Sequence, residues 1–173
     1  KNFANVVLVY YGANTLEMGF VNDYPQIKSV IWCPGTGQTG FNALGEIVAG
    51  EVNPSGHSAD TFVYDLTAAP YFNNINADSV GYTVASQAGG DAKLVPPHFV
   101  NYVEGIYVGY KFYETAAAEG LIDYDKTVQY PFGHGLSYTT FTQKIDSMTE
   151  ADGTITLDVT VTNTGSVAGR DAV

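Results

Sequence analysis

The sequence has little cysteine, few basic residues and no long apolar run, and each shortage excludes a class of protein. The single cysteine, Cys33, excludes an internal disulfide, and its place in an apolar stretch predicts a buried, unreactive thiol. Only 7 Lys and Arg face 18 Asp and Glu, giving a net charge of −11. Such a chain is a poor partner for nucleic acid, which is bound by cations that neutralise phosphates. No apolar run approaches the ~20 residues that span a membrane.

Alternating elements in the first third of the chain predict an α/β fold. Val6–Tyr11 and Ile27–Cys33 are continuous apolar runs, typical of strands covered on both faces. A glycine-rich loop, Pro34–Gly40, follows the second run, and Phe41–Ala49 then predicts a short helix stopped by Gly50. This order indicates a layered α/β sandwich with a mainly parallel sheet and right-handed crossovers.

The next elements are predicted from capping and composition. Asn14, with Glu17 three residues later, resembles a capping box and predicts a helix that ends near Tyr24. Asn53–Gly56 is a turn, and Thr61–Tyr64 reads as a short strand.

The region after residue 70 is harder to interpret. Residues 70–98 are rich in Asn, Gly and Ala without a sustained period, which indicates a long surface excursion. Phe99–Tyr113 is dense in aromatic and β-branched residues and favours strand, with bends at Gly105 and Gly109. Thr115–Gly120 predicts one or two helical turns.

Gln129–Phe141 divides the chain into two kinds of sequence. Helical patterns and apolar runs precede it, whereas strand-like alternation such as Ile155–Thr162 follows it. Within the segment, Pro131 restricts the backbone, and Gly133 and Gly135 permit positive φ. We interpret it as a rigid aromatic connector that offers no nucleophile and no carboxylate.

The glycine-rich loop has the pattern Gly-x-Gly-x-x-Gly between a strand and a helix. Gly35, Gly37 and Gly40 can let the backbone approach a pyrophosphate at a helix N-terminus, and Asp60 follows twenty residues later. Pro34 and the short helix weaken this interpretation. A tight strand-to-helix turn explains the same glycines without any cofactor.

Other chemistry-bearing residues each have a structural explanation beside the functional one. A retaining glycosidase needs two carboxyl groups ~5–5.5 Å apart, and the acids considered are Glu17, Glu46, Glu51, Asp60 and Glu104. His57, His98 and His134 are too scattered to indicate a metal site. Five aromatic residues can stack on sugar rings or fill a core: Tyr102, Tyr107, Tyr110, Phe112 and Tyr113.

Three blocks in order resemble family 3 glycoside hydrolases, the β-glucosidase and β-xylosidase family. They are Val30–Ser55, with Ile-Trp-Cys-Pro-Gly-Thr-Gly; Tyr102–Tyr113, with Tyr-Val-Glu-Gly-Ile-Tyr-Val-Gly-Tyr; and the connector, Tyr-Pro-Phe-Gly-His-Gly-Leu-Ser. The resemblance implies an α/β-sandwich part over residues 1–128, a connector over 129–141 and a truncated fibronectin-III-like domain over 142–173. Since an immunoglobulin-like sandwich needs ~100 residues, we expect the chain to be a fragment.

The resemblance also implies where the catalytic groups lie. In that family the nucleophile is an aspartate of a (β/α)8 barrel, and the acid/base glutamate lies upstream of the part matched here. Neither motif is present, so we expect no catalytic, cofactor-binding or metal-binding residue in this chain. Gly56–Phe62 departs from the common pattern and is more like the subgroup with reversed domain order. The barrel can therefore precede or follow this segment.

The resulting hypothesis is a fragment of a β-glucosidase-like enzyme that is inactive by itself. Its parent would hydrolyse terminal, non-reducing β-D-glucosides by a retaining mechanism, without a cofactor, acting on β-linked gluco- or xylo-oligosaccharides. Two alternatives stay open: a carbohydrate-binding or assembly module, and a nucleotide-binding α/β domain. Because Ile155–Val161 would expose unpaired strand edges, we expect the missing part of its domain, or a second copy in a homodimer, to cover it.

Overall fold

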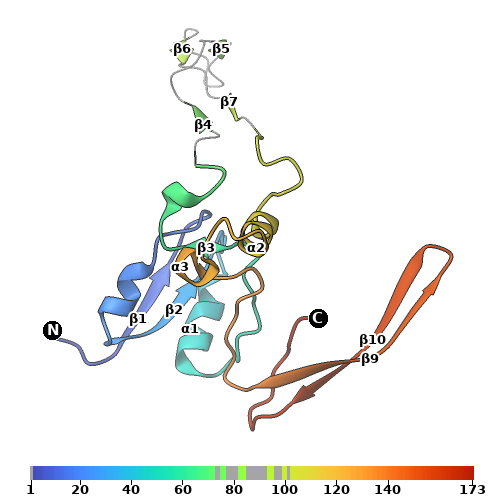
Figure 1. Cartoon of the computed structure of the whole chain (residues 1–173). Helices are drawn as coiled ribbons and strands as arrows, with labels where there is room; N and C mark the ends of the chain where they lie inside the picture. The colour runs from blue at the N-terminus through green and yellow to red at the C-terminus, as the bar shows by residue number, and fades with distance from the viewer. Residues whose placement is uncertain (1, 73–74, 77–81, 85–92, 96–98, 101) are drawn as a thin grey trace. The chain divides into compact units, whose positions relative to one another are not determined.

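The computed structural model describes residues 2–72, 75–76, 82–84, 93–95, 99–100 and 102–173 (Figure 1). Two compact units are present. Unit 1 comprises Lys1–Asn14, Ile27–Ala59 and Phe132–Val173, and unit 2 comprises Thr15–Gln26 and Asp60–Pro131. The domain boundaries that the sequence predicts, after residues 128 and 141, stay a prediction. Among the described residues, no helix combines the length and apolar character needed to cross a membrane.

Unit 1 contains the predicted parallel strand pair. Strand β1 (Val6–Tyr10) pairs with β2 (Ile27–Trp32), and Val9 lies opposite Ile31. The pair is extended by Cys33, whose N–H donates to the Tyr10 carbonyl over 3.0 Å. The α/β fold class is confirmed. Val7 and Val9 remain exposed within this chain, so one face of β1 is not covered by the described residues.

The predicted helix is confirmed at both ends. Helix α1 spans Phe41–Ala49, and Gly50 follows it in the left-handed region with φ 78°. The Gly50 N–H donates to the Glu46 and Ile47 carbonyls, which closes the last helical turn. At the other end, the Phe41 ring lies 5.4 Å from the Tyr11 ring, centroid to centroid, and holds the helix start beside the end of β1.

The capping-box prediction is wrong. In place of a helix beginning at Asn14, the structure has only a short 3-10 helix, η1 (Gly19–Asp23), which begins without a side-chain cap. Glu17 is used elsewhere, because its Oε1 accepts a 2.6 Å hydrogen bond from the Leu66 N–H. That contact joins the segment before η1 to a second 3-10 helix, η2 (Leu66–Ala68). Glu17 therefore bonds to Leu66, which is distant in sequence, and not to the start of a helix at Asn14.

The core of unit 2 lies beneath a helix that the sequence did not predict. Helix α2 spans Tyr110–Ala118, whereas we expected strand up to Tyr113 and helical turns only from Thr115. The helix places Tyr113 in a cluster with Val63 and Val128. Burying Tyr113 and Ala116 on one face of a helix outweighed the strand preference of the aromatic residues. Partly buried side chains complete the cluster: Leu66, Phe112, Ile122 and Tyr124.

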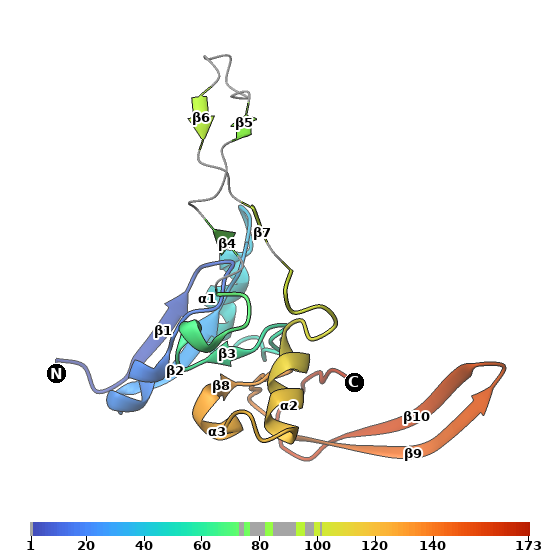
Figure 2. The ribbon, with the colours of Figure 1, turned by 45° about the horizontal axis from the view of Figure 1, so that its top comes forward.

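Short elements complete unit 2. Strand β3 (Phe62–Val63) pairs antiparallel with β8 (Val128–Tyr130), which directly follows α3 (Tyr124–Thr127). The predicted excursion over residues 70–98 lies partly outside the described residues, as does His98. The described residues of this region, together with the two residues after it, form nested antiparallel pairs (Figure 2). They are β4 (Ile75–Asn76) with β7 (Phe99–Val100), and β5 (Tyr82–Val84) with β6 (Lys93–Val95).

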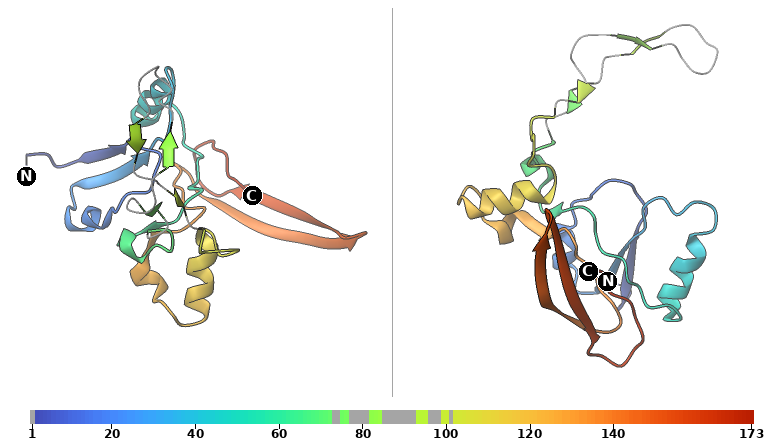
Figure 3. Two further views of the ribbon diagram at one scale, coloured as in Figure 1. Left: turned by 90° about the horizontal axis from the view of Figure 1, so that it is seen from above. Right: turned by 90° about the vertical axis from the view of Figure 1, so that its right-hand side faces the viewer.

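A long hairpin forms the last part of unit 1 (Figure 3). Strand β9 (Phe141–Ala151) pairs antiparallel with β10 (Thr154–Asn163), and the turn residues Asp152 and Gly153 have φ of 52° and 73°. These values suit the Asp-Gly hairpin turn. One face carries Leu157 opposite Met148 and Val159 opposite Ile145, while threonines dominate the other. The apolar face is largely exposed in this chain.

Tyr113 provides a test of the unit 2 core. Its side chain is 1% exposed, and its hydroxyl has no hydrogen-bond partner among the described residues. Burial, with a smaller effect of Tyr71, raises the pKa of this phenol and keeps it neutral. We predict that Tyr113→Phe raises the free energy of unfolding by about 1 kcal/mol, because an unsatisfied buried group is removed. Tyr113→Ala should lower it by about 3–5 kcal/mol through the cavity. Urea denaturation measures the free energy of unfolding of both variants. A Tyr113→Phe variant less stable than the unsubstituted chain would mean that the Tyr113 hydroxyl does have a hydrogen-bond partner.

Candidate functional site

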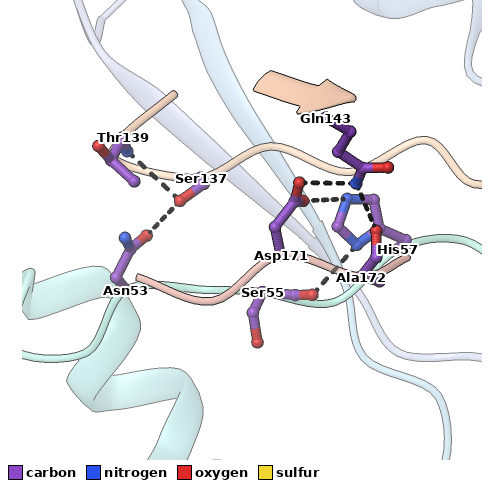
Figure 4. Close-up of polar contacts among 8 residues, drawn as sticks. All are labelled: Asn53, Ser55, His57, Ser137, Thr139, Gln143, Asp171 and Ala172. Carbon is purple, nitrogen blue, oxygen red and sulfur yellow. Dashed lines mark hydrogen bonds and ion pairs between the residues drawn. The ribbon is translucent and has the colours of Figure 1, made fainter. Parts of the chain in front are cut away.

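Asn53 joins three separate segments of unit 1, and Figure 4 shows its contact with Ser137. Its Oδ1 accepts hydrogen bonds from the Ser137 hydroxyl over 2.9 Å and from the Tyr138 N–H over 2.8 Å. Its Nδ2 donates to the Ala168 carbonyl over 3.0 Å. One carboxamide therefore holds the turn after α1, the connector and the segment after β10 together.

His57 makes a second polar junction close by in sequence. Its Nε2 lies 3.6 Å from Asp171 Oδ1, and its Nδ1 lies 3.1 Å from the Ser55 carbonyl oxygen. Gln143 of β9 donates from its Nε2 to Asp171 Oδ2 over 2.9 Å and to the Ala172 carbonyl over 2.7 Å. Figure 4 shows these side chains pointing toward one another. The carboxylate of Asp171 is thus engaged from two sides.

The connector is fastened to the same turn through its backbone. The Ser58 N–H donates to the His134 carbonyl over 2.8 Å, and the Gly133 N–H donates to the Ser58 carbonyl over 2.7 Å. A Cβ atom on Gly135 would lie 2.5 Å from the Gly56 carbonyl oxygen. Burial, aided by nearby His57, lowers the pKa of His134, so its imidazole is kept neutral. Glycine is required at position 135, because the Gly56 carbonyl oxygen leaves no room for a Cβ atom.

These contacts form a structural joint. The connector contributes hydroxyls, backbone groups and one neutral imidazole, and the neighbouring carboxylate of Asp171 is held by Gln143. Within the part of the chain that the structure describes, no group of three or more His, Cys, Asp or Glu residues is arranged to hold a metal ion. The rigid connector over residues 129–141 stays a prediction. Sequence reasoning missed Asn53 and Asp171, because Asn53 was read only as part of a turn.

The glycine-rich loop of unit 1 has the geometry of a tight turn. Gly35 and Gly37 adopt φ of 58° and 63°, and a Cβ atom at either position would meet open space. The Gly40 N–H donates to the Thr36 carbonyl over 3.1 Å, and the Asn42 N–H donates to the Thr39 carbonyl over 3.0 Å. Two backbone donors that a phosphate would need are therefore already engaged. Asp60 belongs to unit 2, not to this loop.

The acids considered as catalytic candidates are dispersed over the two units. Glu46 and Glu51 are exposed near the end of α1 in unit 1. Glu17 contacts η2 in unit 2, and Glu104 accepts from the Tyr107 N–H through its carbonyl over 3.0 Å. Glu46 and Glu51 lie near the same helix end, whereas Glu17 and Glu104 lie in other local structures. We find no support for assigning any of them to a catalytic pair, and the absence of catalytic residues stays a prediction.

The predicted aromatic group divides into buried and exposed members. Tyr113 is in the core and Phe112 is half-buried, whereas Tyr102, Tyr107 and Tyr110 are exposed. Tyr107 and Phe112 line a groove of about 260 Å³ together with Thr115, Ala116 and Leu121. Packing in the core therefore accounts for Phe112 and Tyr113, whereas the exposed tyrosines lie on the surface.

The structure and the sequence both match proteins of one family. The structure matches part of a β-glucosidase from Paenibacillus barengoltzii, with a TM-score of 0.67 and 29% identity. That match covers 94% of this chain and 16% of the larger one. Residues 1–110 match the family model for the glycosyl hydrolase family 3 C-terminal domain. This chain belongs to glycosyl hydrolase family 3, as the sequence motifs predicted.

Curated relatives agree with this family. A β-glucosidase of Ruminococcus albus is 30% identical over 173 residues, which cover 99% of this chain and 15% of the relative. The thermostable β-glucosidase B of Acetivibrio thermocellus is 33% identical, with 98% of this chain and 19% of the relative covered. The chain thus spans about a fifth or less of the length of these relatives.

The joint around Asn53 is testable by truncation. We predict that Asn53→Ala lowers the free energy of unfolding by about 1–3 kcal/mol, because the Tyr138 N–H and the Ala168 carbonyl lose their partner. Asn42→Ala, at an exposed position of α1, is the matched control and should change stability by less than about 0.5 kcal/mol. Chemical denaturation compares the two variants. Equal stability of both would mean that Asn53 does not hold the joint.

The glycine-rich loop is testable by a substitution that separates strain from ligand binding. Gly37→Val should destabilise unit 1 by about 1–3 kcal/mol, because a β-branched residue is strained at its positive φ. Gly45→Ala, inside α1 and facing open space, should instead stabilise by about 0.5–1 kcal/mol. Thermal melts are recorded with and without NAD. A melting shift that NAD causes only in the unsubstituted chain would contradict the turn interpretation.

Proposed function

We propose that this chain is the scaffold portion of a retaining β-glucosidase whose parent hydrolyses terminal, non-reducing β-D-glucosides. The observation that carries the proposal is the alignment with family 3 β-glucosidases over 99% and 98% of this chain, although only 15% and 19% of those relatives is covered. The parent therefore has room for a separate catalytic domain. In this proposal the α/β part, the connector and the start of a fibronectin-III-like domain position that domain.

The carboxylates of this chain make structural contacts, which supports a scaffold role. Retaining hydrolysis needs a nucleophile and an acid/base with carboxyl groups ~5–5.5 Å apart. Here Glu17 binds a backbone N–H, Asp171 binds Gln143, and Asp65 accepts from the Thr67 N–H and hydroxyl. Each of these carboxylates stabilises a loop or a joint. We infer that the catalytic aspartate and glutamate come from parts of the parent outside this chain.

The nucleotide-binding alternative has less support. The N–H groups of Gly40 and Asn42, at the start of α1, donate to carbonyls of the same loop. The net charge of −11 adds no attraction for a pyrophosphate. The carbohydrate-binding alternative rests on the exposed faces of Tyr102, Tyr107 and Tyr110. Stacking on sugars uses such faces but also needs hydrogen-bonding groups beside them. Tyr107 and Thr115 are among the residues that line the groove, but the surface it exposes is almost entirely apolar.

Activity measurements test the proposal directly. We predict no turnover of an aryl β-glucoside by the purified 173-residue chain, and turnover by the full-length parent polypeptide under the same conditions. Aryl β-xyloside and aryl α-glucoside are assayed in parallel as specificity controls. Turnover by the isolated chain that survives further purification would contradict the scaffold role. A parent inactive on both β-glycosides would refute the enzymatic assignment.

A further inference from the structure

His57 of unit 1 lies between the connector and the segment that follows β10. Its ring packs against Gly135, where a Cβ atom would lie 2.8 Å from His57 Cδ2. The two ring nitrogens face different groups: Nδ1 lies 3.1 Å from the Ser55 carbonyl oxygen, and Nε2 lies 3.6 Å from Asp171 Oδ1 (Figure 4). The side chains of His57 and Asp171 are only 28% and 14% exposed, so solvent screens this pair only in part.

The contact with Ser55 fixes the tautomer of the neutral His57 ring. A carbonyl oxygen can only accept, so Nδ1 must carry the proton in this contact. In the neutral ring Nε2 is then an acceptor, and it faces a carboxylate oxygen of Asp171, which is also an acceptor. Their separation of 3.6 Å fits two acceptors, because an N–H···O bond between opposite charges is usually ~2.7–2.9 Å long. A second proton, on Nε2, would let His57 donate to both partners at once.

Asp171 is held in place from the side opposite His57. Gln143 of β9 donates from its Nε2 to Asp171 Oδ2 over 2.9 Å and to the Ala172 carbonyl over 2.7 Å. The carboxamide of Gln143 does not titrate, so this attachment stays the same at any pH. The remaining oxygen, Oδ1, faces His57. The joint therefore has one contact that depends on protons beside contacts that do not.

His134 of the connector is a second titratable group that faces His57. Burial and nearby His57 lower the pKa of His134, so this ring stays neutral to lower pH than an ordinary histidine and adds no positive charge. A lowered pKa in the folded state makes unit 1 less stable as the pH falls. That effect is opposite in sign to a contact that His57 gains by protonation. Arg170, next to Asp171 in sequence, is exposed.

We propose that His57 and Asp171 form a proton-dependent latch, in which one proton taken up from solvent at Nε2 of His57 tightens the segment after β10 onto the turn that carries Ser55. Loss of that proton leaves two acceptors facing each other and loosens the contact. The Asn53 carboxamide still holds Ala168 in either state, so only the end of the segment responds. Histidine is the side chain that ordinarily changes charge between about pH 5 and 8. The latch goes beyond the proposed function and does not depend on the reaction of the parent.

Nuclear magnetic resonance of the 173-residue chain tests the tautomer and the proton uptake. The chain has only three histidines, and the His57 signals are those lost in His57→Gln. At about pH 8 we expect neutral His57 to carry its proton on Nδ1, and at about pH 5.5 on both nitrogens. A neutral ring protonated on Nε2, or a ring unchanged between the two pH values, would overturn the latch.

Asp171→Asn is the matched variant, because it keeps the shape of the side chain and replaces one acceptor by a donor. Its oxygen can still accept from Gln143, while its amide donates to the unprotonated Nε2 of His57. Relative to the unsubstituted chain, we expect the melting temperature of this variant to fall by about 2–4 °C near pH 5.5 and not to fall near pH 8. Comparison at each pH cancels the opposing effect of His134.

Two controls separate the latch from a general effect of charge. Asp152→Asn makes the same change of charge at the exposed hairpin turn, which Asn suits as well as Asp, and should have the same effect at both pH values. In a chain that already carries His57→Gln, Asp171→Asn should also have the same effect at both. An effect of Asp171→Asn that is equal at the two pH values while His57 is present would overturn the latch.

Discussion

The contact on which unit 1 depends most is the Asn53 carboxamide. Its three hydrogen bonds reach Ser137, Tyr138 and Ala168, residues that are 84, 85 and 115 positions away in sequence. Such long loops cost conformational entropy to close, and each closure must be compensated by the contacts it makes possible. Tyr138 adds a further link, because its hydroxyl donates to the Ile47 carbonyl of α1 over 2.7 Å. The turn after α1 thus becomes the common attachment point for the connector and the C-terminal segment.

The joint fixes the ends of the hairpin formed by β9 and β10 but does not cover its apolar face. The joint fixes the two ends of the hairpin, since the Thr139 hydroxyl donates to Asn163 Oδ1 and the Thr164 N–H donates to the Thr140 carbonyl, each over 2.8 Å. Beyond these ends, the apolar face of β9 and β10 stays exposed. A two-stranded sheet buries too little apolar surface for independent stability. Register and turn geometry are therefore local properties of this hairpin, whereas the covering layer expected from the sequence stays a prediction.

Sequence reasoning succeeded where local chemistry determines structure. Helix α1 begins after Gly40 and ends at Gly50 as predicted, because a positive-φ glycine terminates a helix whatever surrounds it. It failed where a distant partner decides. Glu17 bonds to Leu66 instead of capping a helix, and Tyr110–Ala118 is helical because Tyr113 packs against Val63 and Val128. Asn53 and Asp171 were missed for the same reason, since their partners lie far away in sequence.

The same dependence on local backbone geometry explains how this chain can be recognised as a member of glycosyl hydrolase family 3. The recognisable motifs here are backbone requirements: positive φ at Gly35 and Gly37, and close approach at Gly135. Residue type is strongly restricted at such positions, because a side chain would introduce strain or a clash. Catalytic carboxylates act through position rather than backbone shape, so a scaffold can keep its characteristic turns while the chemistry resides elsewhere. Membership of glycosyl hydrolase family 3 is thus evident from glycines whose backbone geometry restricts the residue type.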